Sequence, residues 1–153
     1  MHVLELKVPP VAVVLVTAGC MWLVAWAVPA LEFRFPARDL VALSLAVAGA
    51  VTSALGVISF RRAGTTVNPM KPESSSSLVT SGIYRLTRNP MYLGFLLVLL
   101  GWAVFLSSLP AFLFLPAFIL YMNHFQIEPE ERALAALFGP AFAAYKARTR
   151  RWL

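Results

Sequence analysis

The chain has 153 residues, of which 59% are hydrophobic and 13% are charged. Soluble domains of this size are closer to half apolar and a quarter charged, so the composition excludes an ordinary soluble domain and indicates side chains that face lipid. The net charge of +6 does not indicate nucleic-acid binding. The basic residues flank hydrophobic stretches, where they suit membrane orientation and anionic lipid headgroups.

Charge-free stretches predict the membrane-spanning helices. A hydrocarbon core of roughly 30 Å needs about 20 helical residues, and residues 8–31 and 40–60 each have that length. Residues 89–127 are also free of Asp, Glu, Lys and Arg but are too long for one span. The sequence Ser107-Ser108-Leu109-Pro110 near their middle predicts a hairpin of two helices, 89–107 and 110–127.

The predicted fold class is therefore all-α: a polytopic membrane protein with about four transmembrane helices in a single domain. A membrane β-barrel is excluded because these apolar runs lack the required alternation. A secretory signal peptide is the alternative for residues 8–31, but the run is longer than a usual signal-peptide core.

The distribution of basic residues predicts the orientation. Lys and Arg accumulate in cytoplasmic loops, and the 89–107/110–127 turn has none, while the loop between the first two spans has only Arg34 and Arg38. Both termini are therefore expected in the cytoplasm. The basic residues on that side are Lys7, Arg61, Arg62, Lys71, Arg85, Arg88, Arg132, Lys146, Arg148, Arg150 and Arg151.

Polar residues gather in two predicted cytosolic segments. The loop 61–88 contains Gly64, Pro72 and four serines at 74–77, which predicts irregular, mobile structure. The tail 129–150 is predicted to be an amphipathic helix, because Pro129 suits a first helical turn and apolar residues follow at helical spacing. Gly139-Pro140 should interrupt this helix.

Several kinds of chemistry have no support in the sequence. The histidines are His2 and His124 and the single cysteine, Cys20, lies within the first span, so no metal-ligand cluster is predicted. No glycine-rich phosphate loop or catalytic triad is visible either. His124 lies on one helical face with Tyr121 and Glu128, where both a proton acceptor and a satisfied interfacial polar residue remain open.

Three motifs remain, and together they carry a resemblance. They are Leu78-Val79-Thr80-Ser81-Gly82-Ile83-Tyr84, then Arg88-Asn89-Pro90-Met91-Tyr92-Leu93-Gly94, then Glu130-Glu131 followed by Leu134, Phe138-Gly139 and Tyr145. With these motifs in this order, the chain resembles the isoprenylcysteine carboxyl methyltransferase family of integral membrane enzymes over about residues 65–148.

The resemblance implies S-adenosyl-L-methionine as the cofactor, bound at the cytosolic membrane face. A carboxylate such as Glu130 suits the ammonium group of the cofactor, and Tyr84 and Tyr92 offer aromatic surface for adenine or for the sulfonium cation. The implied cofactor-binding residues are Ser76, Ser77, Leu78, Val79, Tyr84, Asn89, Pro90, Met91, Tyr92 and Glu130.

Two departures from the eukaryotic members concern the reaction. Asn89 stands where they have His, which keeps hydrogen bonding but removes proton transfer. Gln126 stands where they have the Arg that meets the substrate carboxylate, and a neutral amide does not neutralise a carboxylate. Arg88 and Gln126 are the predicted acceptor-side catalytic residues. If the helix continues through Pro129, then Gln126 shares a face with Asn123 and Glu130, and this neutral lining predicts an acceptor that is uncharged when it reacts.

The sequence thus predicts an S-adenosylmethionine-dependent methyltransferase acting on a lipophilic acceptor at the cytosolic membrane interface. The acceptor group is a carboxylate, a thiol or a lipid amine, and the expected partners are this substrate and membrane lipids. The alternative is a small four-helix transporter or a non-catalytic membrane scaffold. Transport requires ionisable groups within the spans, and the predicted spans contain no Asp, Glu, Lys or Arg and a single histidine, His124.

Overall fold

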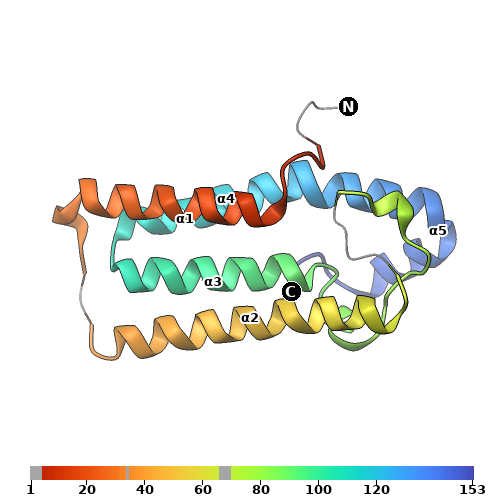
Figure 1. Ribbon diagram of the computed structural model, residues 1–153, viewed down its shortest axis with the longest axis horizontal. Coiled ribbons are helices and arrows are strands. Elements are labelled where there is room, and N and C mark those ends of the chain that lie inside the picture. The colour runs from red at the N-terminus through yellow and green to blue at the C-terminus, as the bar shows by residue number, and fades with distance from the viewer. Residues whose placement is uncertain (1–4, 34, 66–69) are drawn as a thin grey trace.

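The computed structural model describes residues 5–33, 35–65 and 70–153, and these form a bundle of helices (Figure 1). The predicted all-α class is confirmed, since the described residues contain one isolated bridge, Glu32 to Ser108, and otherwise only helices and loops. Arg34 and His2 lie outside the described residues. The helices of the bundle and its polar end are α1 (Pro10–Ala27), α2 (Arg38–Arg62), α3 (Pro90–Leu106), α4 (Phe114–Met122), the π-helix η5 (Asn123–Ile127) and α5 (Glu128–Arg148).

Short 3₁₀ helices connect these elements. They are η1 (Pro29–Leu31), η2 (Pro72–Ser74), η3 (Gly82–Arg85) and η4 (Leu109–Leu113). The reversal between α3 and α4 falls at Ser107, which has a left-handed φ of 53° and ends α3. Its carbonyl accepts a hydrogen bond from Phe33 N at 2.9 Å, so this turn packs against the α1–α2 loop.

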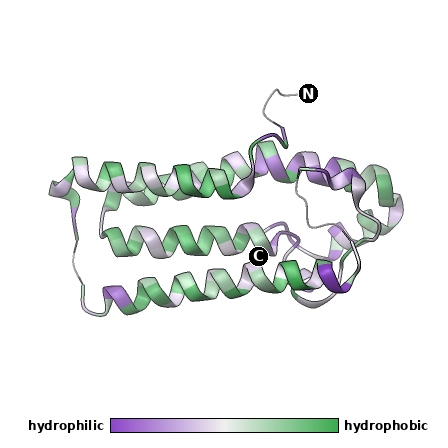
Figure 2. Ribbon diagram, in the orientation of Figure 1, coloured by the Kyte–Doolittle hydropathy of each residue, from purple (hydrophilic) through white to green (hydrophobic). Residues whose placement is uncertain are grey.

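Three stretches are long and apolar enough to cross a membrane: Pro10–Ala27, Arg38–Arg62 and Leu109–Arg148. The shorter apolar helix α3 has 17 residues, or about 25 Å of helix. Large apolar side chains on the outside of the bundle are exposed, such as Leu15, Trp26 and Leu43, and Figure 2 shows hydrophobic residues along α1, α2, α3 and α4. An apolar exterior of this extent indicates lipid contact, which confirms the membrane protein.

Helices α2 and α3 pack most closely, through small residues. Gly49 and Ser53 of α2 face Gly94 of α3, and Ser53 Oγ donates to Met91 O at 3.1 Å. A Cβ atom at Gly94 would overlap Ser53 Oγ and Gly49 O. Small residues allow helix backbones to approach in this way in membranes, and here they fix the start of α3 against α2.

Replacing Gly94 by alanine is therefore expected to destabilise the protein by about 1–3 kcal/mol, the usual effect of overpacking. Thermal unfolding in detergent measures this effect. Gly19→Ala is the matched control, because a Cβ there has no neighbour within 4 Å and alanine favours the helix. Equal melting temperatures for the two variants would show that the α2–α3 contact yields without strain.

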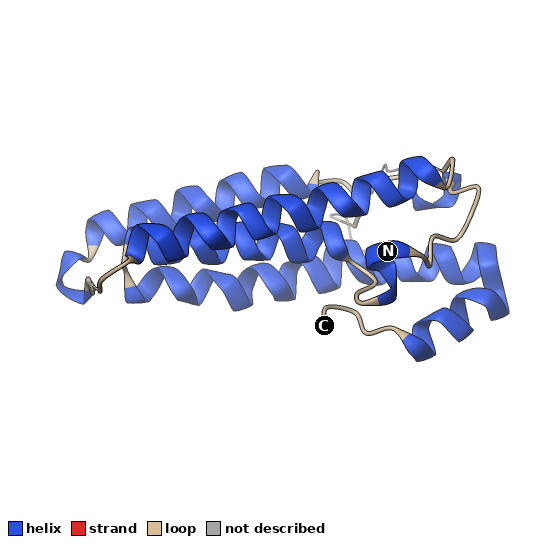
Figure 3. Cartoon of the chain, turned by 90° about the horizontal axis from the view of Figure 1, so that it is seen from below, coloured by secondary structure: helices blue, strands red, loops and turns tan. Residues whose placement is uncertain are grey.

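The chain stays helical from α4 through Pro129. The π turn η5 joins α4 to α5, and Pro129 lies in the first turn of α5, where its missing N–H is tolerated. The break comes at Gly139, with φ 46° and ψ −120°, directly before Pro140. Beyond it the second arm of α5 turns back toward the bundle (Figures 1 and 3).

The two ends of the described chain lie at the α5 end of the bundle. Leu6 N donates to Phe125 O at 3.1 Å, and Glu5 pairs with Arg132 at 2.7 Å. At the other end, residues 149–152 lie beside the start of α3, where Arg88 N donates to Arg150 O at 3.0 Å. Both ends therefore meet the same polar region.

Candidate cofactor-binding site

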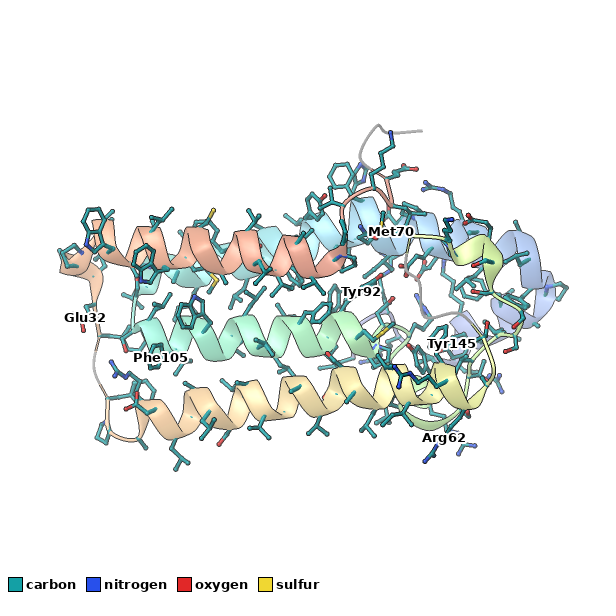
Figure 4. The ribbon with its side chains drawn as sticks, viewed as in Figure 1. Glu32, Arg62, Met70, Tyr92, Phe105 and Tyr145 are labelled. Carbon is teal, nitrogen blue, oxygen red and sulfur yellow. The ribbon has the colours of Figure 1, made fainter. Side chains whose placement is uncertain are left out.

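A cavity lies at the polar end of the bundle, between the α2–α3 loop, the start of α3 and both arms of α5. Figure 4 shows Tyr145 toward this end, Tyr92 near the middle of the molecule, and Glu32 and Phe105 at the opposite end. The lining residues come from four separate segments. They are Phe60, Pro72, Ser75, Ser77, Leu78, Val79, Tyr84, Arg88, Asn89, Met91, Tyr92, Glu130, Glu131, Leu134, Phe142 and Tyr145.

The serine run fixes the loop to the end of α2. Ser76 N donates to Thr65 Oγ1 at 2.9 Å, and Ser77 Oγ donates to Ala63 O at 3.2 Å. The carbonyls at a helix C-terminus have no partner within the helix, so these serines supply donors there. The irregular structure predicted for this loop thus includes defined contacts that hold one wall of the cavity.

Aromatic rings form a second wall. Tyr84 packs edge-to-face on Phe60 with ring centroids 5.3 Å apart, and Tyr145 Oη donates to Tyr84 O at 2.7 Å. Burial raises the pKa of Tyr145 to about 12 and raises the pKa of Tyr84 further. Both phenols are therefore neutral at physiological pH, and they offer aromatic surface rather than a base.

Glu130 presents a carboxyl group to the cavity without a cation beside it. Its partner is Tyr92, whose hydroxyl donates to Glu130 Oε1, and no Lys or Arg pairs with it among the described residues. Burial raises the pKa of Glu130 to about 8, helped by the charge of Glu131 and opposed by the Tyr92 hydrogen bond. A cation entering the cavity would favour the ionised carboxylate.

Glu131, its neighbour in sequence, has the opposite environment. It pairs with Arg88 at 2.8 Å, with Arg151 at 3.0 Å and with Lys146 at 3.2 Å. Burial alone would raise the pKa of Glu131, but the hydrogen bonds from Arg151 and Arg88 outweigh it and lower this pKa to about 2. Glu131 is thus a permanent anion that ties α5 to the start of α3.

Arg88 uses most of its donors within the protein. Besides Glu131 it donates to Lys146 O at 3.2 Å and to Thr149 O. These carbonyls lie at the C-terminal end of α5, where a cation is favoured by the helix dipole. Arg88 Nε is buried and has no hydrogen-bond partner among the described residues, so this donor remains for a ligand.

Most of the predicted site residues meet at the cavity. Of those predicted, Ser77, Leu78, Val79, Tyr84, Arg88, Asn89, Met91, Tyr92 and Glu130 line it. Ser76 and Pro90 do not, although they adjoin residues that do. Ser76 is held against α2, and Pro90 starts α3 and packs toward Gly56.

Gln126 does not line the cavity. It is fully buried, and its Nε2 donates to Val8 O at 2.7 Å at the start of α1, while Oε1 has no partner among the described residues. Asn123 accepts a hydrogen bond from Trp152 at 3.0 Å instead of facing the cavity. Because a π turn takes more residues per turn than an α-helix, η5 rotates these side chains relative to Glu130. The acceptor role of Gln126 stays a prediction.

Sequence reasoning did not assign several lining residues to the site. Leu134 and Tyr145 belong to the motifs of the resemblance, and Phe142 lies on the apolar face of the tail, so a signal existed for these three. Phe60 had none, because an aromatic residue at the end of a span is also typical of a membrane interface. Glu131 also belongs to a motif of the resemblance, whereas Pro72 and Ser75, the remaining lining residues, do not.

Comparison with known proteins identifies the family. Residues 37–141, about two thirds of the chain, match the phospholipid methyltransferase family. An uncharacterized protein of Haemophilus influenzae is 46% identical over 63 residues, which are 41% of this chain and all of that protein. Probable protein-S-isoprenylcysteine O-methyltransferases of Oryza sativa subsp. indica and subsp. japonica are each 35% identical over 108 residues, covering 69% of this chain.

The match spans 55% of each rice protein, so the chain corresponds to about half of their length. No solved structure gives a significant match. The chain belongs to the phospholipid methyltransferase family. The resemblance to isoprenylcysteine methyltransferases is confirmed by the rice proteins, and together these findings support an integral membrane methyltransferase.

Proposed function

We propose that the chain transfers a methyl group from S-adenosyl-L-methionine to a lipophilic acceptor, and that the cavity holds the cofactor. The observation that carries the proposal is Glu130, a carboxyl group facing an aromatic cavity without a paired cation. Burial of such a group is unfavourable unless a partner compensates it. S-adenosylmethionine carries an ammonium and a sulfonium group, so its charge complements this site.

The cavity residues fit the different parts of this cofactor. Glu130 would pair with the ammonium group, and the unpartnered Nε of Arg88 would donate to the carboxylate of the amino-acid end. Tyr84, Tyr92 and Phe142 line the same cavity, and their rings suit adenine or the sulfonium cation. Tyr84 comes from η3, Tyr92 from α3, Glu130 and Phe142 from α5, and Arg88 from the loop before α3.

The bound cofactor would supply the methyl group as an electrophile attached to sulfur. The chain's own residues contribute binding, orientation and exclusion of water, which account for much of the acceleration of a two-reactant step. The neutral phenols of Tyr84 and Tyr145 do not accept a proton. Arg88 and Glu131 would hold the start of α3 and α5 together while acceptor and methyl group align.

The acceptor is proposed to reach the cavity from the bilayer, with membrane lipids as partners of the apolar exterior. The family description and the names of the rice proteins indicate different acceptors: the first refers to phospholipids and the second to isoprenylcysteine. Arg88 pairs with Glu131 at 2.8 Å, and its unpartnered Nε would donate to the cofactor carboxylate, so its guanidinium is already engaged when an acceptor arrives. This pairing supports an acceptor that is uncharged when it reacts, such as a thiol or a neutral lipid amine.

The proposed orientation in the membrane depends on the α5 end of the bundle, which holds the cavity. Residues 5–8 contact η5 and α5, and residues 149–152 contact α5 and the start of α3, so both lie toward the α5 end of the bundle, as an even number of crossings requires. We propose that the cavity and both termini face the cytoplasm, where the water-soluble cofactor is available.

The test is calorimetric binding of S-adenosylmethionine and S-adenosylhomocysteine to the purified protein in detergent, followed by a labelled-methyl screen of lipophilic acids, thiols and phospholipid amines. We expect both cofactor forms to bind at micromolar to millimolar concentration and the neutral acceptors to be methylated preferentially. Absence of binding at millimolar concentration would reject the enzyme in favour of a transporter or scaffold. Preferential methylation of acids would reject the neutral acceptor alone.

A further inference from the structure

Residues 149–152, here called the strap, follow the end of α5 and lie against the start of α3. Arg150 O accepts a hydrogen bond from Arg88 N at 3.0 Å, and Arg151 O accepts one from Asn89 Nδ2 at 3.0 Å. Thr149 O accepts from the Arg88 guanidinium. Three consecutive carbonyls of the strap thus hold the two cavity residues that open the second motif.

No residue of the strap lines the cavity itself. The side chains of Arg151 and Trp152 contact the helix that runs through η5 and α5. Arg151 pairs with Glu131 at 3.0 Å and with Glu128 at 3.5 Å, and Trp152 Nε1 donates to Asn123 Oδ1 at 3.0 Å. The strap therefore bridges two walls of the cavity without entering it.

We propose that the strap positions Arg88 and Asn89 for cofactor binding, and that Arg151 and Trp152 are its positioning residues. An irregular segment beyond a helix is poorly ordered unless something ties it down, and these two side chains tie it to η5 and α5. Without these two side chains the strap moves away, and the Arg88 amide and the Asn89 side chain exchange its carbonyls for water. The planar amide of Asn89 and the guanidinium of Arg88 then lose the orientation that the cavity requires.

This inference rests on the proposed function for its cofactor readout, but not for its structural readout. The backbone amide of Arg88 reports on the strap directly, because its hydrogen-bond acceptor is Arg150 O. Opening of the strap breaks this hydrogen bond and speeds hydrogen exchange of the Arg88 amide, whether or not any cofactor binds.

The experiment compares Arg151→Gln with Arg150→Gln in the full chain in detergent. The two variants remove the same charge at adjacent positions, and the exposed side chain of Arg150 has no ion pair among the described residues. Arg151→Gln leaves Glu131 paired with Arg88 and Lys146, so the fold is retained. Trp152→Phe is the second variant, since it removes the hydrogen bond to Asn123 away from the ion pairs.

We expect Arg151→Gln to quicken exchange of the Arg88 amide at least about tenfold and to weaken S-adenosylhomocysteine binding about tenfold, the usual loss for a charged hydrogen bond. Arg150→Gln should match the unmodified protein, Arg151→Lys should restore part of both effects, and Trp152→Phe should resemble Arg151→Gln more weakly. An equal exchange rate of the Arg88 amide in Arg151→Gln and Arg150→Gln would contradict the proposal that Arg151 positions the strap.

The remaining outcomes are also decisive. Faster exchange with unchanged cofactor affinity would overturn the positioning role and leave the strap as a structural tie. If the unmodified protein binds no cofactor, the proposed function fails. In that case the inferred positioning for cofactor fails with it, while the exchange data still show whether Arg151 holds the start of α3.

Discussion

Replacing Glu130 by glutamine is expected to weaken S-adenosylhomocysteine binding by about 1.5–3 kcal/mol, or roughly 10- to 160-fold, because a hydrogen bond to a charged group is lost. Glutamine keeps the size of the side chain and an acceptor for the Tyr92 hydroxyl. It also removes a carboxyl group that burial disfavours, so the protein should remain folded. Calorimetry in detergent measures the affinity.

The pH dependence identifies the cause of this loss. The ammonium group of the ligand favours the ionised carboxylate, whereas the pKa of Glu130 in the free protein is about 8. Below pH 8 binding must therefore release a proton, and affinity should rise with pH by up to about tenfold per unit before it levels off above pH 8. The Glu130→Gln variant should show only the pH dependence of the ligand itself.

Glu73→Gln is the matched control for charge, since Glu73 is exposed in the loop beside the cavity and does not line it. It should bind like the unmodified protein. If Glu130→Gln bound the ligand as tightly as Glu73→Gln, then Glu130 would not be the ammonium partner and the proposed orientation of the cofactor would be wrong.

Replacing Glu131 by glutamine is expected to destabilise the protein by about 3 kcal/mol, the lower end of the loss when a buried ion pair is broken. Arg88, Arg151 and Lys146 would then lose the anion that they share, and only Arg151 would keep a second one, Glu128. This corresponds to a melting temperature roughly 6–12 °C lower for a chain of this size. Thermal unfolding in detergent, again beside Glu73→Gln, measures it.

Acid should have the same effect on the unmodified protein. The pKa of Glu131 is about 2 in the folded protein and about 4.5 when unfolded, so its stabilising contribution is complete above pH 4.5 and is lost as pH falls toward 2. The Glu131→Gln variant should lack this component of the acid sensitivity. Equal stability of Glu131→Gln and Glu73→Gln at neutral pH would mean that the ion cluster does not hold α5 to α3.

The two adjacent glutamates illustrate how far sequence reasoning reached. The motif indicated Glu130 as a cofactor residue, and the structure places its carboxyl group in the cavity. Glu131 belongs to the same motif but was not among the predicted site residues. Its pairing with Arg88 and Arg151 joins residues far apart in sequence, and such partners follow from tertiary packing rather than from any local pattern.

The sequence by itself determined the membrane class, the hairpin at 107–110 and most of one cavity wall. These depend on lengths of apolar residues, on turn chemistry and on a contiguous motif at 88–94, all of which are local. Tertiary structure decided the rest. Phe60 reaches the cavity from the end of α2, the π turn η5 turns Gln126 toward α1, and the strap acts through backbone carbonyls. Every residue has such a carbonyl, so only the path of the chain selects the ones that hold Arg88 and Asn89.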